Sequence, residues 1–269
     1  MNLEELKKCK YGFTHNGTFH ADDVFATAFI KMLNPNIIII RGSIVPENFS
    51  GIVYDIGDGE FDHHGISEYR NNKIPYAAFG KLWRCFAPLI YDKYIVDSID
   101  RKFISLLDLS DNTGSKDSLC IAIGALNPCD DSSGDKEFEE AVRIATIFLN
   151  KLIEQENSIL LEEKEVKKAY EKSKNKEIIV LNKHLHFTES LPVTKAIYVV
   201  FPSKRGGYSA QGVPINNDTV ELKKPFPKKW LTSLPDYLTF CHKSRFLISA
   251  DSLDKIVYAC NIALKDVEK

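Results

Sequence analysis

Short apolar runs and one amphipathic stretch organise the first part of the chain. Residues 11–14 form an apolar run that ends in a polar loop, and Asp22 then opens the periodic stretch VFATAFIKML, which predicts strand, loop and helix. The runs IIII at 37–40 and IVY at 52–54 are short and β-branched, as expected for buried strands of a parallel sheet. This half is therefore predicted to be α/β, with a polar loop where such folds bind ligands.

Helical spacing dominates the middle of the chain. Residues 75–110 are predicted to be mainly helical, with Pro75 at the first helical position of PYAAFGKLWRCF. After the polar loop DDSSGD at 130–135, apolar residues at helical spacing predict one long helix that extends to about residue 174. Charged residues crowd its second half, which indicates a solvated connector.

From residue 177 onward the pattern changes to short β-type runs, EIIVL, KAIYVVF and RFLISA, with a closing helix at about 252–265. We therefore predict an α/β protein in which an N-terminal parallel-sheet domain is joined by a long helix to a smaller α+β C-terminal domain. The expected bounds are 1–134, 135–175 and 176–269.

Composition narrows the functional classes. The formal net charge is −2, so the chain as a whole does not attract nucleic acid, and any polyanion must bind to a local patch. The 6 cysteines form no CxxC pair, which argues against a zinc knuckle and for reduced thiols. No run approaches the roughly 20 apolar residues of a membrane span, and the N-terminus lacks an apolar signal core. We expect a cytoplasmic protein without membrane contact.

Histidines cluster beside carboxylates. Five of the 7 histidines fall in the motifs THNGTFHADD at 14–23, FDHHG at 61–65 and CHKSRF at 241–246. The first motif places His15, His20 and Asp22 on a strand-to-helix loop, where donor atoms can converge on a metal ion. Capping of the helix by Asp22 or Asp23 is the simpler explanation for one aspartate, but it leaves both histidines unexplained.

The second motif brings His63 and His64 close in sequence to Asp55, which follows an apolar strand. Mixed imidazole and carboxylate ligands suit Mn²⁺, Fe²⁺ or Zn²⁺ better than Ca²⁺. With Asp108 and Asp111 of LLDLSDN, there are more candidate ligands than one ion needs. They fit two ions that share a carboxylate and activate a water for attack on phosphorus, and we expect Asp55 to be the bridge.

These motifs resemble a known family. The order THNGTFHADD, YDIGDGEFDHHG, LDLSDN is similar to that of the metal-dependent hydrolases related to the melanocyte proliferating gene protein, a branch of the DHH phosphoesterase superfamily. YAAFGKLW, RGGYSAQGVP at 205–214 and CHKSRF follow in the family's order, so the resemblance covers nearly the whole chain. It implies a DHH-like catalytic domain, a C-terminal substrate-binding domain, and Mn²⁺-dependent exonuclease activity on RNA or DNA.

The resemblance also assigns residues. It matches His15, His20 and Asp22 to the first metal motif, Asp55 to the second, His63 and His64 to the DHH motif, and Asp111 or Asp108 to the fourth; His64, Asp55 and His63 are the catalytic candidates. The wider superfamily has aspartate at the position of His20. The family's segment after the C-terminal histidine is rich in glycine and small residues, whereas this chain has Lys243 and Arg245 there.

Substrate binding is predicted in the C-terminal domain. Residues 202–245 hold eight Lys and Arg against three Asp and Glu, an excess that suits a phosphate backbone, although the KKPFPKK stretch is equally typical of a solvated face. The candidates are Arg205, His242, Lys243 and Arg245.

Three functions stay open at this stage. The first is a Mn²⁺-dependent nuclease or small-phosphodiester hydrolase with two ions, for which Mg²⁺, Fe²⁺ or Zn²⁺ are other options. The second is a metal-dependent hydrolase of C–N bonds. The third is a non-catalytic protein that keeps the metal site. The sequence is compatible with a homodimer.

Overall fold

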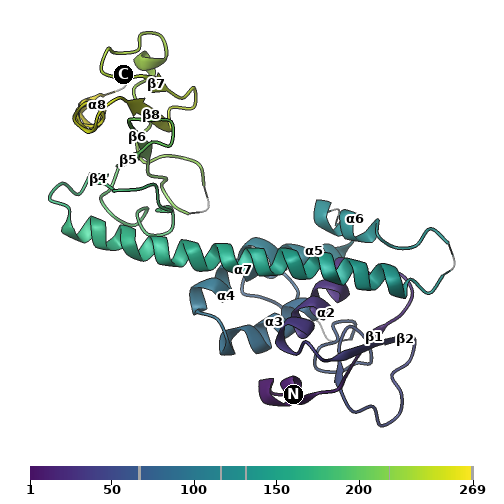
Figure 1. The fold of residues 1–269 in the computed structure, drawn as a ribbon. Helices are drawn as coiled ribbons and strands as arrows, with labels where there is room; N and C mark the ends of the chain where they lie inside the picture. Colours follow the sequence, from purple (N-terminus) through teal and green to yellow (C-terminus); the bar gives the residue numbers. More distant parts are fainter. Residues whose placement is uncertain (66–67, 116, 131, 218, 268–269) are drawn as a thin grey trace. The chain divides into compact units, whose positions relative to one another are not determined.

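The computed structural model describes residues 1–65, 68–115, 117–130, 132–217 and 219–267 (Figure 1). The chain divides into two compact units, Met1–Asn157 and Ser158–Lys269, and the division falls inside the long helix α7 (Asp135–Lys172). Both units mix α and β structure. In the described part of the chain, no helix is both long and apolar enough to cross a membrane.

The N-terminal unit is built around a parallel three-stranded sheet of order β2-β1-β3. Its strands are β1 (Tyr11–His15), β2 (Ile38–Gly42) and β3 (Ile52–Val53), and α2 (Ala21–Leu33) is the crossover between β1 and β2. The predicted strand, loop and helix at the start of the chain are thus confirmed. The short helix α1 (Leu3–Lys8), which the pattern did not predict, precedes β1.

The prediction that 37–40 forms a wholly buried strand is wrong. Ile38 is 51% exposed and Ile40 is 38% exposed. The reason is topological, because β2 is an edge strand of the sheet and, among the described residues, pairs with β1 alone.

Helices make up the rest of this unit. They are α3 (Ala78–Phe86), the 3₁₀ turn η1 (Ala87–Leu89), α4 (Lys93–Ile99), the π-helical segment η2 (Asp100–Ile104), α5 (Ser105–Thr113) and α6 (Ser118–Gly124). Pro75 does not begin the first of them, contrary to the prediction. Its backbone pairs instead with Tyr69 in an isolated bridge, and its carbonyl accepts from the Arg70 guanidinium, which keeps the segment before Ala78 extended.

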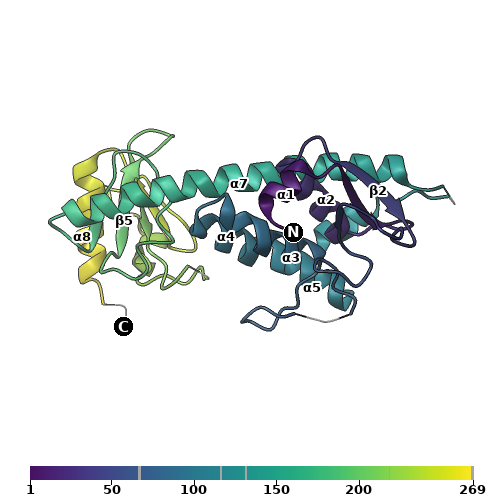
Figure 2. The same cartoon turned by 90° about the horizontal axis from the view of Figure 1, so that it is seen from below.

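The first part of α7 lies along the N-terminal unit (Figures 1 and 2). The Phe138 ring packs edge-on against Phe19 at 5.6 Å between centroids, and Glu156 accepts from the Ser98 hydroxyl at 2.8 Å. These contacts make the first half of the helix a structural member of the unit.

The C-terminal unit holds a five-stranded sheet of order β4-β5-β6-β8-β7. The strands are β4 (Ile178–Val180), β5 (Tyr198–Pro202), β6 (Tyr208–Gly212), β7 (Phe240–Cys241) and β8 (Leu247–Ala250); η3 (Lys228–Leu231) is a 3₁₀ turn. Helix α8 (Leu253–Lys265) packs on the sheet through Ile256, Ala259 and Cys260. The predicted β runs and closing helix are confirmed.

Candidate metal centre

Three chain segments deliver acidic and imidazole side chains to one edge of the parallel sheet. His15 is the last residue of β1, Asp22 and Asp23 stand in the first turn of α2, and Asp55 follows β3. The carboxyl ends of parallel strands meet at the same edge, and the N-terminus of a helix favours negative charge. The local structure therefore explains why these residues meet.

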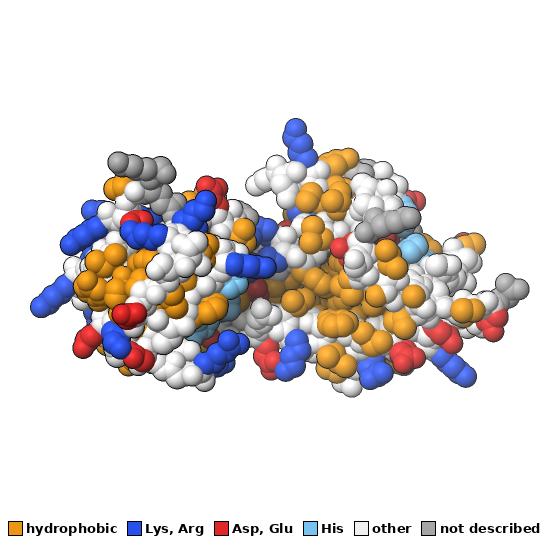
Figure 3. Space-filling view, turned by 90° about the horizontal axis from the view of Figure 1, so that it is seen from above, with side chains coloured by type: hydrophobic (Ala, Val, Ile, Leu, Met, Phe, Trp, Pro, Cys, Tyr) orange, Lys and Arg blue, Asp and Glu red, His pale blue; other side chains and the backbone are white. Residues whose placement is uncertain are grey.

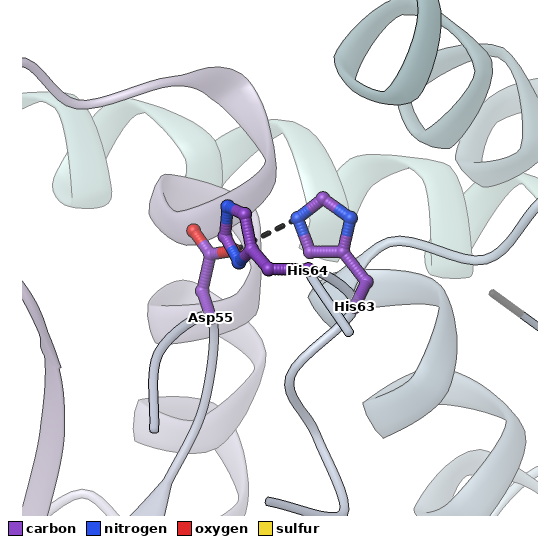
Figure 4. A group of neighbouring side chains, drawn as sticks. All are labelled: Asp55, His63 and His64. Carbon is purple, nitrogen blue, oxygen red and sulfur yellow. Dashed lines mark hydrogen bonds and ion pairs between the residues drawn. The ribbon is translucent and has the colours of Figure 1, made fainter. Parts of the chain in front are cut away.

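Asp55 lies at the centre of the cluster. Its Oδ2 atom is 3.2 Å from His15 Nε2, and its Oδ1 atom is 3.0 Å from His63 Nε2 and 3.9 Å from His64 Nδ1. Figure 4 shows both adjacent imidazole rings beside this carboxylate. Asp55 has a φ of 58°, a left-handed conformation that is uncommon outside glycine and is found at functional sites.

A second set of contacts extends from His63 to α5. His63 Nε2 is also 3.3 Å from Asp111 Oδ2, and its Nδ1 atom is 3.3 Å from Asn112 Oδ1. Both partners come from the LDLSDN motif. His63 is thus fixed on two sides while its ring stays buried.

Asp22 is fixed by the start of α3. Its two carboxylate oxygens accept from the backbone amides of Ala78 and Phe79, each at 2.9 Å. A carboxylate is a favourable partner for unpaired amides at a helix N-terminus. The contact links the first metal motif to the YAAFGKLW motif.

The turn that carries FDHHG is held by Asp62 and Lys81. Asp62 accepts from the backbone amides of Asp58 and His64, at 2.7 and 3.1 Å, and its Oδ1 atom lies 2.7 Å from His64 Nδ1. The buried ammonium of Lys81 donates to the Asp62 carbonyl at 2.6 Å. These bonds orient the His64 ring, which is 61% exposed.

Burial and charge shift the pKa values in opposite directions. Burial raises the pKa of Asp23 to about 7 and raises that of Asp22 well above its usual range, where the charge of Asp55 adds to the effect. Burial opposes charge on Asp55 too, but hydrogen bonds with His15 and His63 lower its pKa to about 2. Burial alone would lower the pKa of His15, but the bond with Asp55 and the charge of Asp23 raise it to about 9.

The donor atoms fall into three overlapping groups, each with its ligand atoms within 4.8 Å of one another. The groups are Asp55, His63 and His64; His15, Asp23 and Asp55; and Asp22, His63 and Asp111. Residues of all three groups line a cavity of about 800 Å³. Among the described residues, the buried Oδ2 atom of Asp23 accepts no hydrogen bond, and His15 Nε2 lies 3.3 Å from it. The donor groups bring Asp22, Asp23, Asp55 and Asp111 together, and buried carboxylates need counter-charges, so the residues fit divalent cations.

Two of the predicted ligands lie outside these groups. His20 is the N-cap residue of α2, and its side chain is exposed. Its Nδ1 atom is 3.9 Å from Asp111 Oδ1. Asp108 is fully buried, and its Oδ2 atom forms an ion pair with Arg70 Nη2 at 2.7 Å. Of the two aspartates of LDLSDN, the structure thus brings Asp111 into the cluster.

Two residues at the site were not predicted as functional. Asp23 was considered only as a helix cap, and its Oδ1 atom does accept from the His20 amide at 2.8 Å while Oδ2 lies 3.3 Å from His15 Nε2. Asp62, the first residue of the DHH motif, orients His64. The paired acids of HADD were the available signal for Asp23.

The predicted substrate residues lie on two turns of the C-terminal unit. Arg205 is exposed in the turn between β5 and β6. His242, Lys243 and Arg245 belong to the turn between β7 and β8, where the Arg245 amide donates to the His242 carbonyl at 2.7 Å. Arg245 has a φ of 57°, a conformation that favours glycine.

The lysine-rich segment is largely committed to internal contacts. The Lys223 ammonium donates to three backbone carbonyls at 2.7 to 3.0 Å, and Lys224 donates to the Leu264 carbonyl at 2.7 Å. Lys229 is paired with Asp266. On the face shown in Figure 3, the Lys and Arg side chains of this unit are spread among hydrophobic and acidic ones. The excess of Lys and Arg in residues 202–245 is therefore larger than the number of side chains that are available to bind a phosphate backbone.

Comparison with known proteins yields one family. The family model MYG1_exonuc, described as an uncharacterised protein family (UPF0160), matches residues 13–264. The MYG1 protein of Chlamydia muridarum is 27% identical, covering 94% of this chain and 96% of that protein. The MYG1 protein of Dictyostelium discoideum is also 27% identical, covering 81% and 82%. No solved structure matches significantly.

Proposed function

Because the chain belongs to the MYG1_exonuc family, we propose that it is a metal-dependent phosphodiester hydrolase of the DHH superfamily, an exonuclease or oligonucleotide phosphodiesterase that uses two Mn²⁺ ions. The family name supports the nuclease class, whereas the relatives are named only MYG1 protein. The observation that carries the proposal is the overlap of the donor groups, since Asp55 and His63 each belong to two of them.

The overlap supports a site for two ions. His15, Asp23 and Asp55 would hold one ion, and Asp22, His63 and Asp111 the other. Asp55 is the proposed shared carboxylate, because its Oδ1 atom lies 3.0 Å from His63 Nε2 of the second group. When bound, divalent cations there would supply Lewis acidity toward a phosphoryl group and would activate a water molecule. Their positive charge also compensates the buried carboxylates, whose pKa values are raised.

Hydrogen bonds set the ligand orientations in advance. Asp22 accepts from two backbone amides, so its carboxylate is held before any ion binds. His63 Nδ1 is hydrogen-bonded to Asn112 Oδ1, so the Nε2 atom faces Asp55 and Asp111. Partners of this kind fix ring orientation and increase metal affinity.

His64 is the candidate for proton transfer to the substrate. Its Nδ1 atom is hydrogen-bonded to Asp62. The Nε2 atom could therefore bind a phosphate oxygen or protonate the leaving oxygen. The side chain lines the cavity and is exposed, which gives a substrate access to it.

The proposed substrates are RNA or DNA oligonucleotides or a small phosphodiester. Arg205, His242, Lys243 and Arg245 are the proposed phosphate contacts of the C-terminal unit. All four lie on turns between strands, and Arg205 and Lys243 are exposed, which supports this assignment. The half-buried Arg245 also donates to the Phe226 carbonyl at 3.2 Å.

The test uses the full-length protein with Mn²⁺ and short 5′-labelled RNA or DNA. We expect stepwise shortening that disappears in Asp55→Ala and His63→Ala. His186→Ala is the matched control, because His186 pairs with Glu162 in the C-terminal unit and lies outside all three groups. Mn²⁺ binding without any cleavage would favour the non-catalytic alternative, and cleavage of amides with one bound ion would favour a C–N hydrolase.

A further inference from the structure

The helix that carries Asp111 contains a wider turn. Segments α4, η2 and α5 follow one another without a break from Lys93 to Thr113, and η2 is π-helical. In an uninterrupted α-helix, residues eight positions apart are separated by about 80° around the axis. A π turn takes more residues per revolution and so closes part of that angle. Asp100 and Asp108 thereby reach the same partner.

That partner is Arg70, which is buried. Its Nη2 atom is 2.6 Å from Asp100 Oδ1 and 2.7 Å from Asp108 Oδ2, and its Nε atom donates to Asp100 Oδ2 at 2.9 Å. The Nη1 atom donates to the Pro75 carbonyl at 3.1 Å, and the guanidinium lies 4.0 Å from the Tyr76 ring centroid. Such a fork holds both carboxylates in one geometry, which a lysine does not do.

Asp108 connects Arg70 to the rest of α5 and to α3. Asp111 stands one turn further along α5, and a Cβ added to Gly80 of α3 would come within 1.9 Å of Asp108 Oδ2. Gly80 directly follows Ala78 and Phe79, whose amides bind Asp22. Through Asp108, Arg70 therefore supports both helices that position the carboxylates of the group Asp22, His63 and Asp111: α5 carries Asp111, and the amides of α3 bind Asp22. The contacts of Arg70 with Asp100, Asp108, Pro75 and Tyr76 do not include His15, Asp23 or Asp55.

We propose that Arg70 is a positioning residue of the metal centre: by clamping Asp100 and Asp108, it fixes the rotation of α5 that directs Asp111 at His63. Arg70 does not ligate metal, and it acts on the group Asp22, His63 and Asp111. The inference rests on the proposed function in one respect, namely that the cluster binds metal.

The test is Mn²⁺ titration of the metal-stripped, full-length protein by isothermal calorimetry. The wild type is expected to bind two ions. In Arg70→Lys, which keeps the charge but loses the fork, one site is expected to weaken by about 10-fold, the lower end of the range for a direct hydrogen-bond partner of a ligand, because Arg70 acts on Asp111 through α5. The other site keeps its affinity. A protein that was merely less stable would not lose one site selectively.

Arg84→Lys is the matched control. Arg84 also lies against the Tyr76 ring, at 4.5 Å, but its ion pair is with Glu68 and its side chain is largely exposed. We expect both sites to keep wild-type affinity in this variant. Asp100→Asn is the second test variant, since Asp100 is partly exposed and the change keeps its shape. A smaller loss at the same single site is expected, and circular dichroism confirms that each variant is folded.

The outcomes separate the two claims. The positioning role alone is overturned if both sites keep wild-type affinity in Arg70→Lys and Asp100→Asn. It is also overturned if both sites lose affinity by the same factor. A wild-type protein that binds no Mn²⁺ overturns the proposed function and this inference with it.

Discussion

Asp23 and His15 set the response of the metal centre to pH. Burial raises the pKa of Asp23 to about 7, so the ionised carboxylate destabilises the folded state above its unfolded pKa. The pKa of His15 is raised from 6.5 to about 9, so its stabilising contribution is complete below 6.5 and is lost as the pH rises through 9. Both effects favour the folded, metal-free protein at the lower pH. The low pKa of Asp55 becomes relevant only in acid, below its usual value of 3.8.

We therefore predict that the melting temperature in EDTA falls as the pH rises from 6.5 to about 9. In Asp23→Asn, which retains an Oδ1 acceptor for the His20 amide, the fall is smaller and the metal-free protein is more stable at the upper end. Saturating Mn²⁺ is expected to reverse the slope, because ligands must be deprotonated to bind. Differential scanning fluorimetry across this range measures all three effects. A melting temperature in EDTA that rises with pH contradicts the electrostatics described here.

Residue type and clustering named most of the side chains that the structure brings together. His15, Asp22, Asp55, His63 and Asp111 were named from the sequence, and the structure brings them together. The division of labour between adjacent residues was not predictable. Side chains of neighbouring helical residues diverge by about 100°, so the sequence offered a role for one aspartate of HADD. Both carboxylates belong to the donor groups because both stand in the first turn of α2, at the end of the helix that meets the cluster.

Lysines of the segment from Lys223 to Lys229 stabilise the C-terminal unit through internal hydrogen bonds and an ion pair. The Lys223 ammonium binds the carbonyls of Leu191, Thr194 and Ala196, and burial lowers its pKa. We predict that Lys223→Met destabilises the C-terminal unit by about 1–3 kcal/mol, the cost of leaving buried acceptors unpaired. Affinity for single-stranded RNA or DNA should be unchanged where the variant remains folded.

Lys243→Met is the counterpart of that variant. Lys243 is exposed on the turn between β7 and β8, so stability should change by less than about 0.5 kcal/mol. The salt dependence of oligonucleotide binding should become shallower if this lysine neutralises a phosphate. Urea unfolding and fluorescence anisotropy at several salt concentrations measure both quantities. Loss of binding in Lys223→Met at full stability would assign the phosphate contact to the lysine-rich segment instead.

Helices and strands with regularly spaced apolar residues were predictable from the sequence. Their pairing partners and local irregularities were not. The spacing of apolar residues located α2, α7, α8 and the longer strands. It did not reveal that β2 is an edge strand, since exposure depends on which strand pairs beyond it. The π segment at Asp100–Ile104 was equally invisible, because one wider turn barely changes the apolar pattern. The packing of Arg70 against two carboxylates explains that turn only once the partners are known.

The whole molecule consists of two units that share one helix. A change from helical to β-type pattern near residue 177 predicted a separate C-terminal domain, but the compact units divide at Asn157 and Ser158. Nothing in the spacing of apolar residues marks this point, because the helix continues through it. What distinguishes the two halves of α7 is the set of partners: Glu156 binds Ser98, whereas Glu163 accepts from the Glu189 and Ser190 amides.

This organisation predicts that metal protects only one unit. An ion that binds the folded state at 100 times its dissociation constant stabilises it by about 2.7 kcal/mol. All the ligand groups belong to Met1–Asn157, so hydrogen exchange of the full-length protein should slow on Mn²⁺ addition in β1, the first turn of α2, residues 52–65 and α5. Strands β5, β6 and β8 should exchange at the same rate with Mn²⁺ and with EDTA. The Asp55→Ala variant is the control, in which the difference between the two conditions should vanish. Protection that spreads equally over both units would mean that they unfold as one cooperative body, since stabilisation by a ligand is shared by every residue that opens in the same step.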